Sequence, residues 1–163
     1  MTEVLEPWKD FNVAMVGATA ALAGLVIVAA SVNISRIVTA RTITARLAAA
    51  IATLVLALVA SGVGLVPGIS APWYGTLVAV VAVVAGVFQA HATIRIAREH
   101  ASAFRLKFFK AALGFVPIAA YFAAGVVTVA APRAGLALAA GGCLAAIASA
   151  IVISWVALVE VLR

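Results

Sequence analysis

The side chains that could carry chemistry gather near the ends of two apolar segments. Asn33 lies close to the end of the first segment, and Gln89 and His91 lie close to the end of the third. Arg36 and Arg95 follow within about one turn of helix. If both segments cross a membrane in the same direction, these groups lie at a similar depth. They would form an inner polar layer at the mouth of a cavity.

Histidine changes its charge near neutral pH, so His91 could gate such a cavity. The alternative is an interfacial role, in which these side chains bond to one another, to the backbone or to lipid headgroups. No other combination of residues points to a reaction. The chain has no Ser/His/Asp arrangement, no phosphate-binding loop and no Cys/His cluster with metal-ligand spacing, and its single cysteine, Cys143, lies in an apolar segment. The sequence therefore favours a protein that is not an enzyme and uses no metal or cofactor.

The elements that must position these residues are membrane helices. The chain is 67% hydrophobic and 10% charged, whereas soluble domains are about 45–50% apolar and about 25% charged. Because lipid offers the backbone no hydrogen-bond partner, each apolar segment must be helical. The sequence predicts one all-α membrane domain over residues 1–163, a bundle of five transmembrane helices. The spans are expected at about 12–34, 47–66, 73–93, 111–131 and 135–159.

Only the short sequence APRAG separates the fourth and fifth spans. A bundle of four transmembrane helices, with part of this stretch re-entrant, is therefore the second choice. All five Asp and Glu residues lie outside the centres of the spans, which argues against a proton pump or a carboxylate-coupled transporter. A passive pore lined by hydroxyl and carbonyl groups remains compatible with this composition.

The basic residues predict the orientation of the bundle. Nine of the 11 Lys and Arg residues belong to the first and third connections and the C-terminus, leaving Lys9 and Arg133 for the other side. The positive-inside rule then places the N-terminus outside and the C-terminus in the cytoplasm. Trp73 and Tyr74 are expected at the outer headgroup level. The acidic N-terminus is unlike a cleaved signal peptide, so we expect it to be retained.

The basic connection at about 94–110 predicts a contact with anionic lipid. Its apolar residues recur every three or four positions, with basic residues between them. This pattern is typical of a helix on the cytoplasmic leaflet or of an extension of the neighbouring spans, and each basic side chain would contribute about 1 kcal/mol. The net charge of +6 is explained by membrane orientation, so no nucleic-acid partner is expected. The residues expected to contact lipid are Arg98, Arg105, Lys107 and Lys110.

The first span carries small residues along one narrow line of its helix, which we call the small-residue stripe. Small residues collect where helix backbones approach closely in lipid. The stripe is therefore predicted to pack against another helix, either of this chain or of a neighbouring subunit. Asn33 lies about 160° away from it, on the side of Thr19 and Val26. The stripe consists of Gly17, Ala21, Gly24, Val28, Ser31 and Ser35.

Residues 8–37, about a fifth of the chain, resemble a stretch of a family of small, mostly uncharacterised bacterial membrane proteins. The resemblance rests on Trp8 and Phe11, on the run Ala20–Leu25, and on the ending from Ser31 to Asn33. Some members of that family carry the label "modulator of FtsH protease". The resemblance implies a multi-span protein of the bacterial inner membrane.

Three functions follow as hypotheses. The first is a homo-oligomeric pore or channel-like assembly with the first helix near its axis. The second is a non-catalytic accessory or regulatory subunit of a larger membrane protein complex, such as a protease or a respiratory enzyme. The third is lipid or quinone binding by Gln89, His91 and Tyr121.

Overall fold

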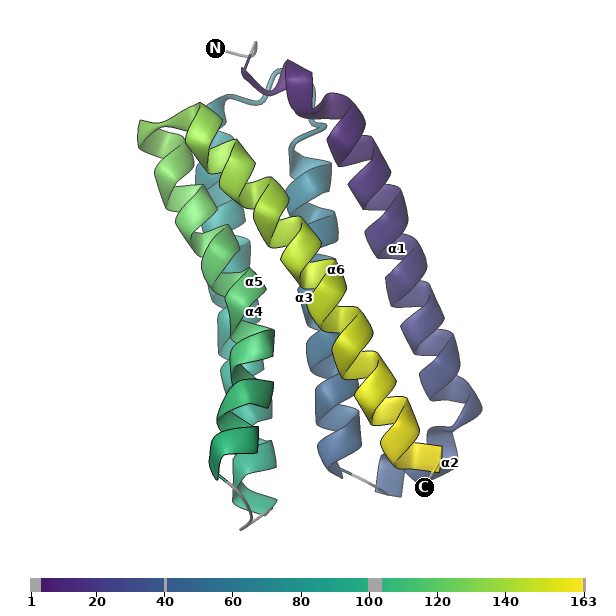
Figure 1. Ribbon diagram of the computed structural model, residues 1–163. Helices are drawn as coiled ribbons and strands as arrows, with labels where there is room; N and C mark the ends of the chain where they lie inside the picture. The colour runs from purple at the N-terminus through teal and green to yellow at the C-terminus, as the bar shows by residue number, and fades with distance from the viewer. Residues whose placement is uncertain (1–3, 40, 100–103, 163) are drawn as a thin grey trace.

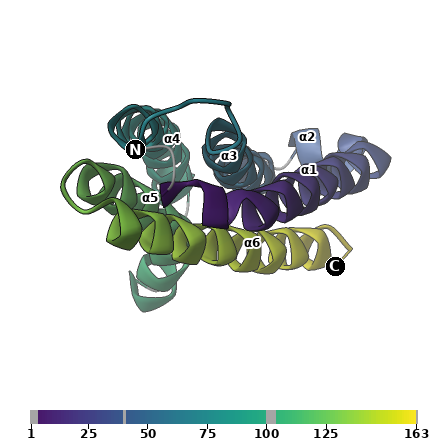
Figure 2. The same cartoon turned by 90° about the horizontal axis from the view of Figure 1, so that it is seen from above.

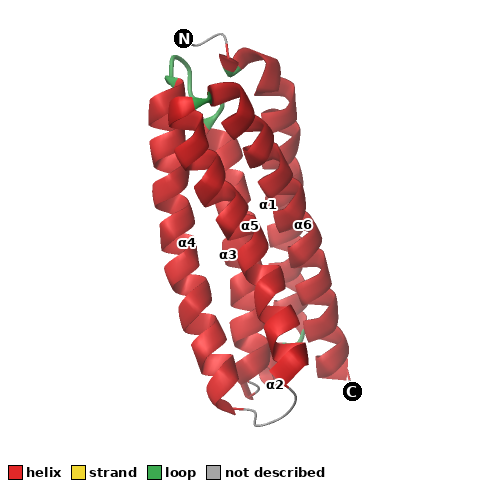
Figure 3. Ribbon diagram, turned by 60° about the vertical axis from the view of Figure 1, so that its left-hand side comes forward, coloured by secondary structure: helices red, strands yellow, loops and turns green. Residues whose placement is uncertain are grey.

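The computed structural model describes residues 4–39, 41–99 and 104–162, and all of its regular elements in these ranges are helices (Figures 1 and 3). Five long helices are joined by short connections, and two short helices flank the first of them. The long helices are α1 (Lys9–Val32), α3 (Arg41–Val63), α4 (Ala71–Glu99), α5 (Phe104–Ala130) and α6 (Pro132–Leu162). The short ones are the 3-10 helix η2 (Glu6–Trp8) and α2 (Ile34–Thr39).

Successive long helices run up and down through one bundle (Figure 1). The N-terminus, the α3–α4 connection and the α5–α6 turn lie at one end, which we call the N-terminal end. Helix α2 and the C-terminus lie at the opposite, C-terminal end. Seen from above, α3 lies between α1 and α4, with α5 and α6 alongside (Figure 2). Helix α1 packs mainly on α3 and α6, whereas α4 packs mainly on α3 and α5.

Four helices in the described part of the chain are long and apolar enough to cross a membrane. Their apolar stretches agree with the predicted first, second, third and fifth spans to within a few residues. They are Glu6–Val32, Ile43–Val63, Ala71–Ile94 and Pro132–Val156. The chain is therefore a multi-span helical membrane protein.

The predicted fourth span corresponds to α5, whose apolar stretch Gly114–Ala130 is shorter than the other four. The whole helix is 27 residues long, or about 40 Å at 1.5 Å per residue. It continues through Pro117 and packs beside both α4 and α6. The basic connection at 94–110 is an extension of two spans, since α4 reaches Glu99 and α5 begins at Phe104. Residues 100–103 of that connection lie outside the described residues.

The two connections at the N-terminal end are built differently. Pro67 and Gly68 turn the chain between α3 and α4, and Gly68 has a φ of 75°, which a residue with a side chain adopts only with strain. A single residue, Ala131, separates α5 from α6, and Pro132 begins α6, where its missing N–H costs no hydrogen bond. Such short connections hold neighbouring helices antiparallel.

Helices α4 and α5 cross with their backbones in close contact at Gly75 and Gly125. A Cβ atom placed on Gly125 would lie 2.6 Å from the Gly75 carbonyl oxygen and 2.7 Å from the backbone nitrogen of Ala79. Small residues at such crossings let membrane helices gain dispersion contacts that lipid cannot provide. This crossing holds the N-terminal half of α4 against α5.

Candidate functional site

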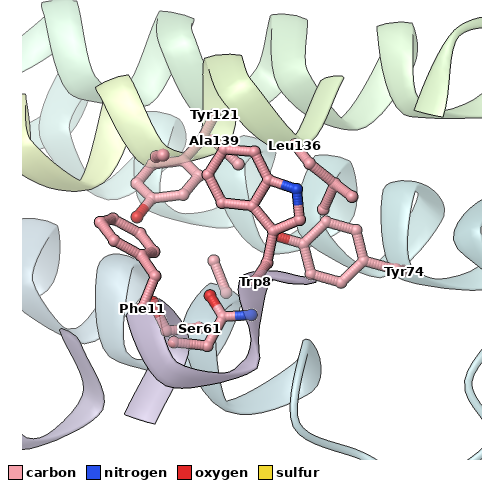
Figure 4. A pocket seen from close by; sticks show the side chains of 10 residues that line it. Trp8, Phe11, Ser61, Tyr74, Tyr121, Leu136 and Ala139 are labelled. Atoms are coloured by element: carbon pink, nitrogen blue, oxygen red, sulfur yellow. The ribbon is translucent and has the colours of Figure 1, made fainter. Parts of the chain in front are cut away.

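A small pocket lies inside the N-terminal end of the bundle, between side chains from all five long helices and η2 (Figure 4). Trp8 and Phe11 enter it from the N-terminal segment, Tyr74 from α4 and Tyr121 from α5. Because its walls come from every helix, the pocket forms only when the whole bundle is folded. The complete lining is Trp8, Phe11, Asn12, Ala60, Ser61, Tyr74, Tyr121, Leu136, Ala139 and Ala140.

The start of the chain folds over this pocket. Leu5 is buried among residues of the bundle core, and Trp8, Phe11 and Met15 pack against that core. The rings of Trp8 and Phe11 meet edge to face, with centroids 5.9 Å apart and planes at 87°, a geometry that aromatic pairs favour. The N-terminal segment is therefore anchored by apolar contacts, whereas its charged side chains Glu6 and Lys9 stay exposed.

The polar side-chain groups of the pocket are uncharged: one amide, three hydroxyls and the indole N–H of Trp8. The Asn12 side chain packs against Gly64, which has no side chain to block it. The Cys143 thiol lies near the hydroxyls of Ser61 and Tyr121. Even so, neither the Tyr121 hydroxyl nor the Asn12 Nδ2 atom has a hydrogen-bond partner of good geometry among the described residues.

The pocket is shallow and does not continue along the bundle. Its volume is about 10 Å³, close to the least that holds one water molecule and far below a cofactor site of several hundred Å³. One turn deeper, apolar side chains from several helices fill the core: Ala57 of α3, Val78 of α4 and Ala146 of α6 are all buried. The pocket therefore does not extend past these described residues into the bundle.

Tyr74 lies inside the bundle rather than at its surface. The sequence predicted Trp73 and Tyr74 together at the headgroup level, but only Trp73 is exposed, at 67%, whereas Tyr74 is 2% exposed. Adjacent residues on a helix point about 100° apart, so one ring can face outward while the next lines the pocket.

The structure does not bring the described members of the inner polar layer together. The Asn33 side chain donates to the Ala29 carbonyl, 3.2 Å away in its own helix. His91 is exposed, and its Nδ1 atom lies 2.9 Å from the Val87 carbonyl oxygen. Gln89 faces the opposite way and is buried with its amide against Gly114 of α5.

These placements also separate the residues expected to bind a lipid or quinone. Gln89 packs at Gly114, which lies seven residues, or about 10 Å along α5, from Tyr121. His91 is exposed on the other side of α4. The three residues thus line no common site.

The basic residues of the predicted sites occupy the C-terminal end of the bundle, as the arrangement of the helices requires. Their backbones belong to α2, α4 and α5. The side chains of Arg36, Arg95, Arg98, Arg105, Lys107 and Lys110 lie outside the described part of the structure.

The small-residue stripe runs along α1 to Ser35 in α2, and we call it the α1 stripe from here on. It faces away from the rest of the described chain. All six of its residues are exposed, and a Cβ atom placed on Gly17 or Gly24 would meet nothing within 4 Å. The opposite side of α1 packs into the bundle instead, through Asn12, Thr19 and Val26. Two neighbours were considered for the stripe, and no helix in the described part of the same chain packs on it.

The sequence offered only weak signals for the N-terminal pocket. Asn12 is on the same side of α1 as Asn33, and Tyr121 is a polar side chain within an apolar span. Neither observation predicts that Asn12 and Tyr121 line the same pocket. Whether they lie close together depends on how α1 and α5 are placed around α3 and α6.

No known protein family, no curated protein and no solved structure matches the chain. Its architecture identifies it as a small multi-span helical membrane protein.

Proposed function

We propose that the protein forms a homo-oligomeric, channel-like assembly in the bacterial inner membrane, without enzymatic activity, and that α1 lies near the oligomer axis. The observation that carries this proposal is the exposure of the whole α1 stripe. Lipid chains contact large side chains more fully than they contact glycine, whereas a second helix gains most where small residues allow close approach. A stripe of small residues with nothing against it fits an adjacent copy of α1.

The small size of the pocket in the described core of one subunit supports the same assembly. The pocket at the N-terminal end holds about 10 Å³, too little for a pore, and the proposal therefore puts the pore between subunits. Exposed Ser31 and Ser35 would place hydroxyl groups along such an axis toward the C-terminal end. Ser31 already donates to the Ile27 carbonyl oxygen at 2.8 Å, which leaves its lone pairs available to a passing solute.

The proposal is tested by native mass spectrometry of the gently solubilised protein together with solute flux in liposomes. We expect a single oligomer of defined stoichiometry and a flux that empty liposomes lack. A strict monomer that releases no trapped solute would contradict the proposal.

The alternative function is an accessory or regulatory subunit of a larger membrane complex, a protease or respiratory enzyme. The same exposed stripe would then pack on a helix of the larger protein, and the resemblance of the N-terminal stretch to proteins labelled as protease modulators supports it. This alternative predicts a monomer or dimer that copurifies with a second membrane protein and conducts nothing. The spectrum and the flux assay together distinguish the two functions.

We further propose five membrane crossings, with the N-terminal end outside, and contacts of the basic C-terminal end with anionic lipid of the cytoplasmic leaflet. The up-and-down course of five helices supports an odd number of crossings, which puts the two termini on opposite sides. A reporter active only in the cytoplasm is expected to be active at the C-terminus and inactive at the N-terminus. Activity at both termini would indicate four crossings.

A further inference from the structure

Two buried polar groups without partners share the N-terminal pocket. Asn12 and Tyr121 are 6% and 1% exposed. The Asn12 Nδ2 atom and the Tyr121 hydroxyl have no hydrogen-bond partner of good geometry among the described residues, although the Cys143 thiol lies near that hydroxyl, and both residues line the same cavity. Buried polar groups are nearly always hydrogen-bonded, because an unpaired group lowers the stability of the folded state. Two such groups on one cavity point to a shared ligand.

The size and chemistry of the cavity limit what that ligand can be. A volume of about 10 Å³ admits one water-sized molecule and excludes a lipid chain or a quinone ring. The polar groups of the lining are neutral: an amide, hydroxyls and the indole of Trp8. The nearby charges of Glu6 and Lys9 pair with each other at the surface. A bare ion in the pocket would thus have lost its hydration without gaining a counter-charge.

We propose that this cavity binds one neutral, water-sized hydrogen-bonding molecule, a water, which bridges Asn12 of α1 and Tyr121 of α5. The water accepts from the Asn12 amide and donates to, or accepts from, the Tyr121 hydroxyl. Helices α1 and α5 are not packing neighbours, since α3 and α6 lie between them. The bridge therefore adds a polar link to the apolar contacts that Trp8 and Phe11 already make with the core containing Tyr121.

Substituting Tyr121→Phe tests the bridge because it removes only the hydroxyl. If a water joins the two groups, the substitution breaks a hydrogen bond and leaves Asn12 poorly satisfied, so we expect the melting temperature to fall by about 3 °C. If the hydroxyl is unpaired, removing it relieves a penalty, and the melting temperature stays the same or rises. The sign of the shift decides between the two.

Ser154→Ala is the matched control. Ser154 is also buried with an unpartnered hydroxyl, but it is not among the residues that line the pocket. We expect its melting temperature to be unchanged or higher. A fall of the same size in both variants would overturn the proposal, since it would then reflect hydroxyl removal in general.

A direct readout does not depend on the variants folding. In nuclear magnetic resonance spectra of the protein in nanodiscs, the Asn12 side-chain amide should show a cross-peak to a long-lived water. The absence of this cross-peak would contradict the bridge. A different outcome is a shift of the same resonance when another salt is replaced stepwise by sodium chloride at constant ionic strength. Such a shift would assign the cavity to an ion and overturn the proposal of a neutral ligand.

Discussion

Replacing Gly125 by alanine is expected to destabilise the bundle by about 3 kcal/mol, at the upper end of the usual cost of overpacking. The added methyl group would lie 2.6 Å from the Gly75 carbonyl oxygen and 2.8 Å from the Ala79 Cβ atom. A rotamer change of a neighbouring side chain cannot relieve these contacts, because the Gly75 oxygen and the nearby Ala79 nitrogen belong to the backbone. Helices α4 and α5 would have to separate, and the pocket walls formed by Tyr74 and Tyr121 would separate with them.

Gly141→Ala is the control for this experiment. Gly141 lies on the exposed side of α6, and a Cβ atom there would meet nothing within 4 Å. Alanine is favoured over glycine inside a helix by up to about 1 kcal/mol, so this variant should be as stable as the natural protein or slightly more so. Unfolding by increasing fractions of denaturing detergent, followed by circular dichroism, measures both. Equal stability of the two variants would show that the helices do not cross closely at Gly125.

Replacing Gly24 by leucine is expected to convert the proposed oligomer into single subunits. A leucine side chain on the α1 stripe would hold two helix backbones apart where Gly24 allows contact. Gly24 is exposed, and a Cβ atom there would meet nothing within 4 Å in its own chain, so the fold and its melting temperature should be preserved. We expect the dissociation constant of the oligomer to rise at least about tenfold, which corresponds to about 1.4 kcal/mol.

The matched control is Gly141→Leu, the same substitution at an exposed glycine of another membrane-spanning helix. Single-molecule photobleaching in supported bilayers gives the subunit number for each variant. The natural protein and Gly141→Leu should share one stoichiometry, and Gly24→Leu should be monomeric. If Gly24→Leu keeps the natural stoichiometry, the α1 stripe is not the contact between copies. If Gly141→Leu alone dissociates, the interface lies on α6.

The helices could be predicted from the sequence because lipid imposes a simple condition on the backbone. A run of apolar residues long enough to cross hydrocarbon must satisfy its N–H and C=O groups internally, and only a helix does so along a single segment. Hydropathy alone therefore located α1, α3, α4 and α6. It was less informative for α5, whose described apolar stretch Gly114–Ala130 is shorter and contains Pro117.

The same condition explains why the inward faces of the helices were harder to predict. In water, the apolar side of a helix faces the core. In lipid both sides are apolar, so the spacing of apolar residues no longer indicates which side faces the core. The sequence predicted packing along Gly17 and Gly24, yet within the chain the packed side carries Asn12, Thr19 and Val26. Small residues show where helices can approach closely without showing which helix approaches.

The sequence by itself determined that this protein is helical, apolar and built of consecutive membrane-length segments, because these properties depend on local composition. Only the tertiary structure decided that Tyr74 turns inward beside an exposed Trp73, that Gln89 and His91 face opposite sides of α4, and that Asn12 and Tyr121 line one cavity. These side-chain arrangements depend on the rotation and order of whole helices around α3. Those are set by many weak backbone and side-chain contacts, which no single segment of the sequence contains.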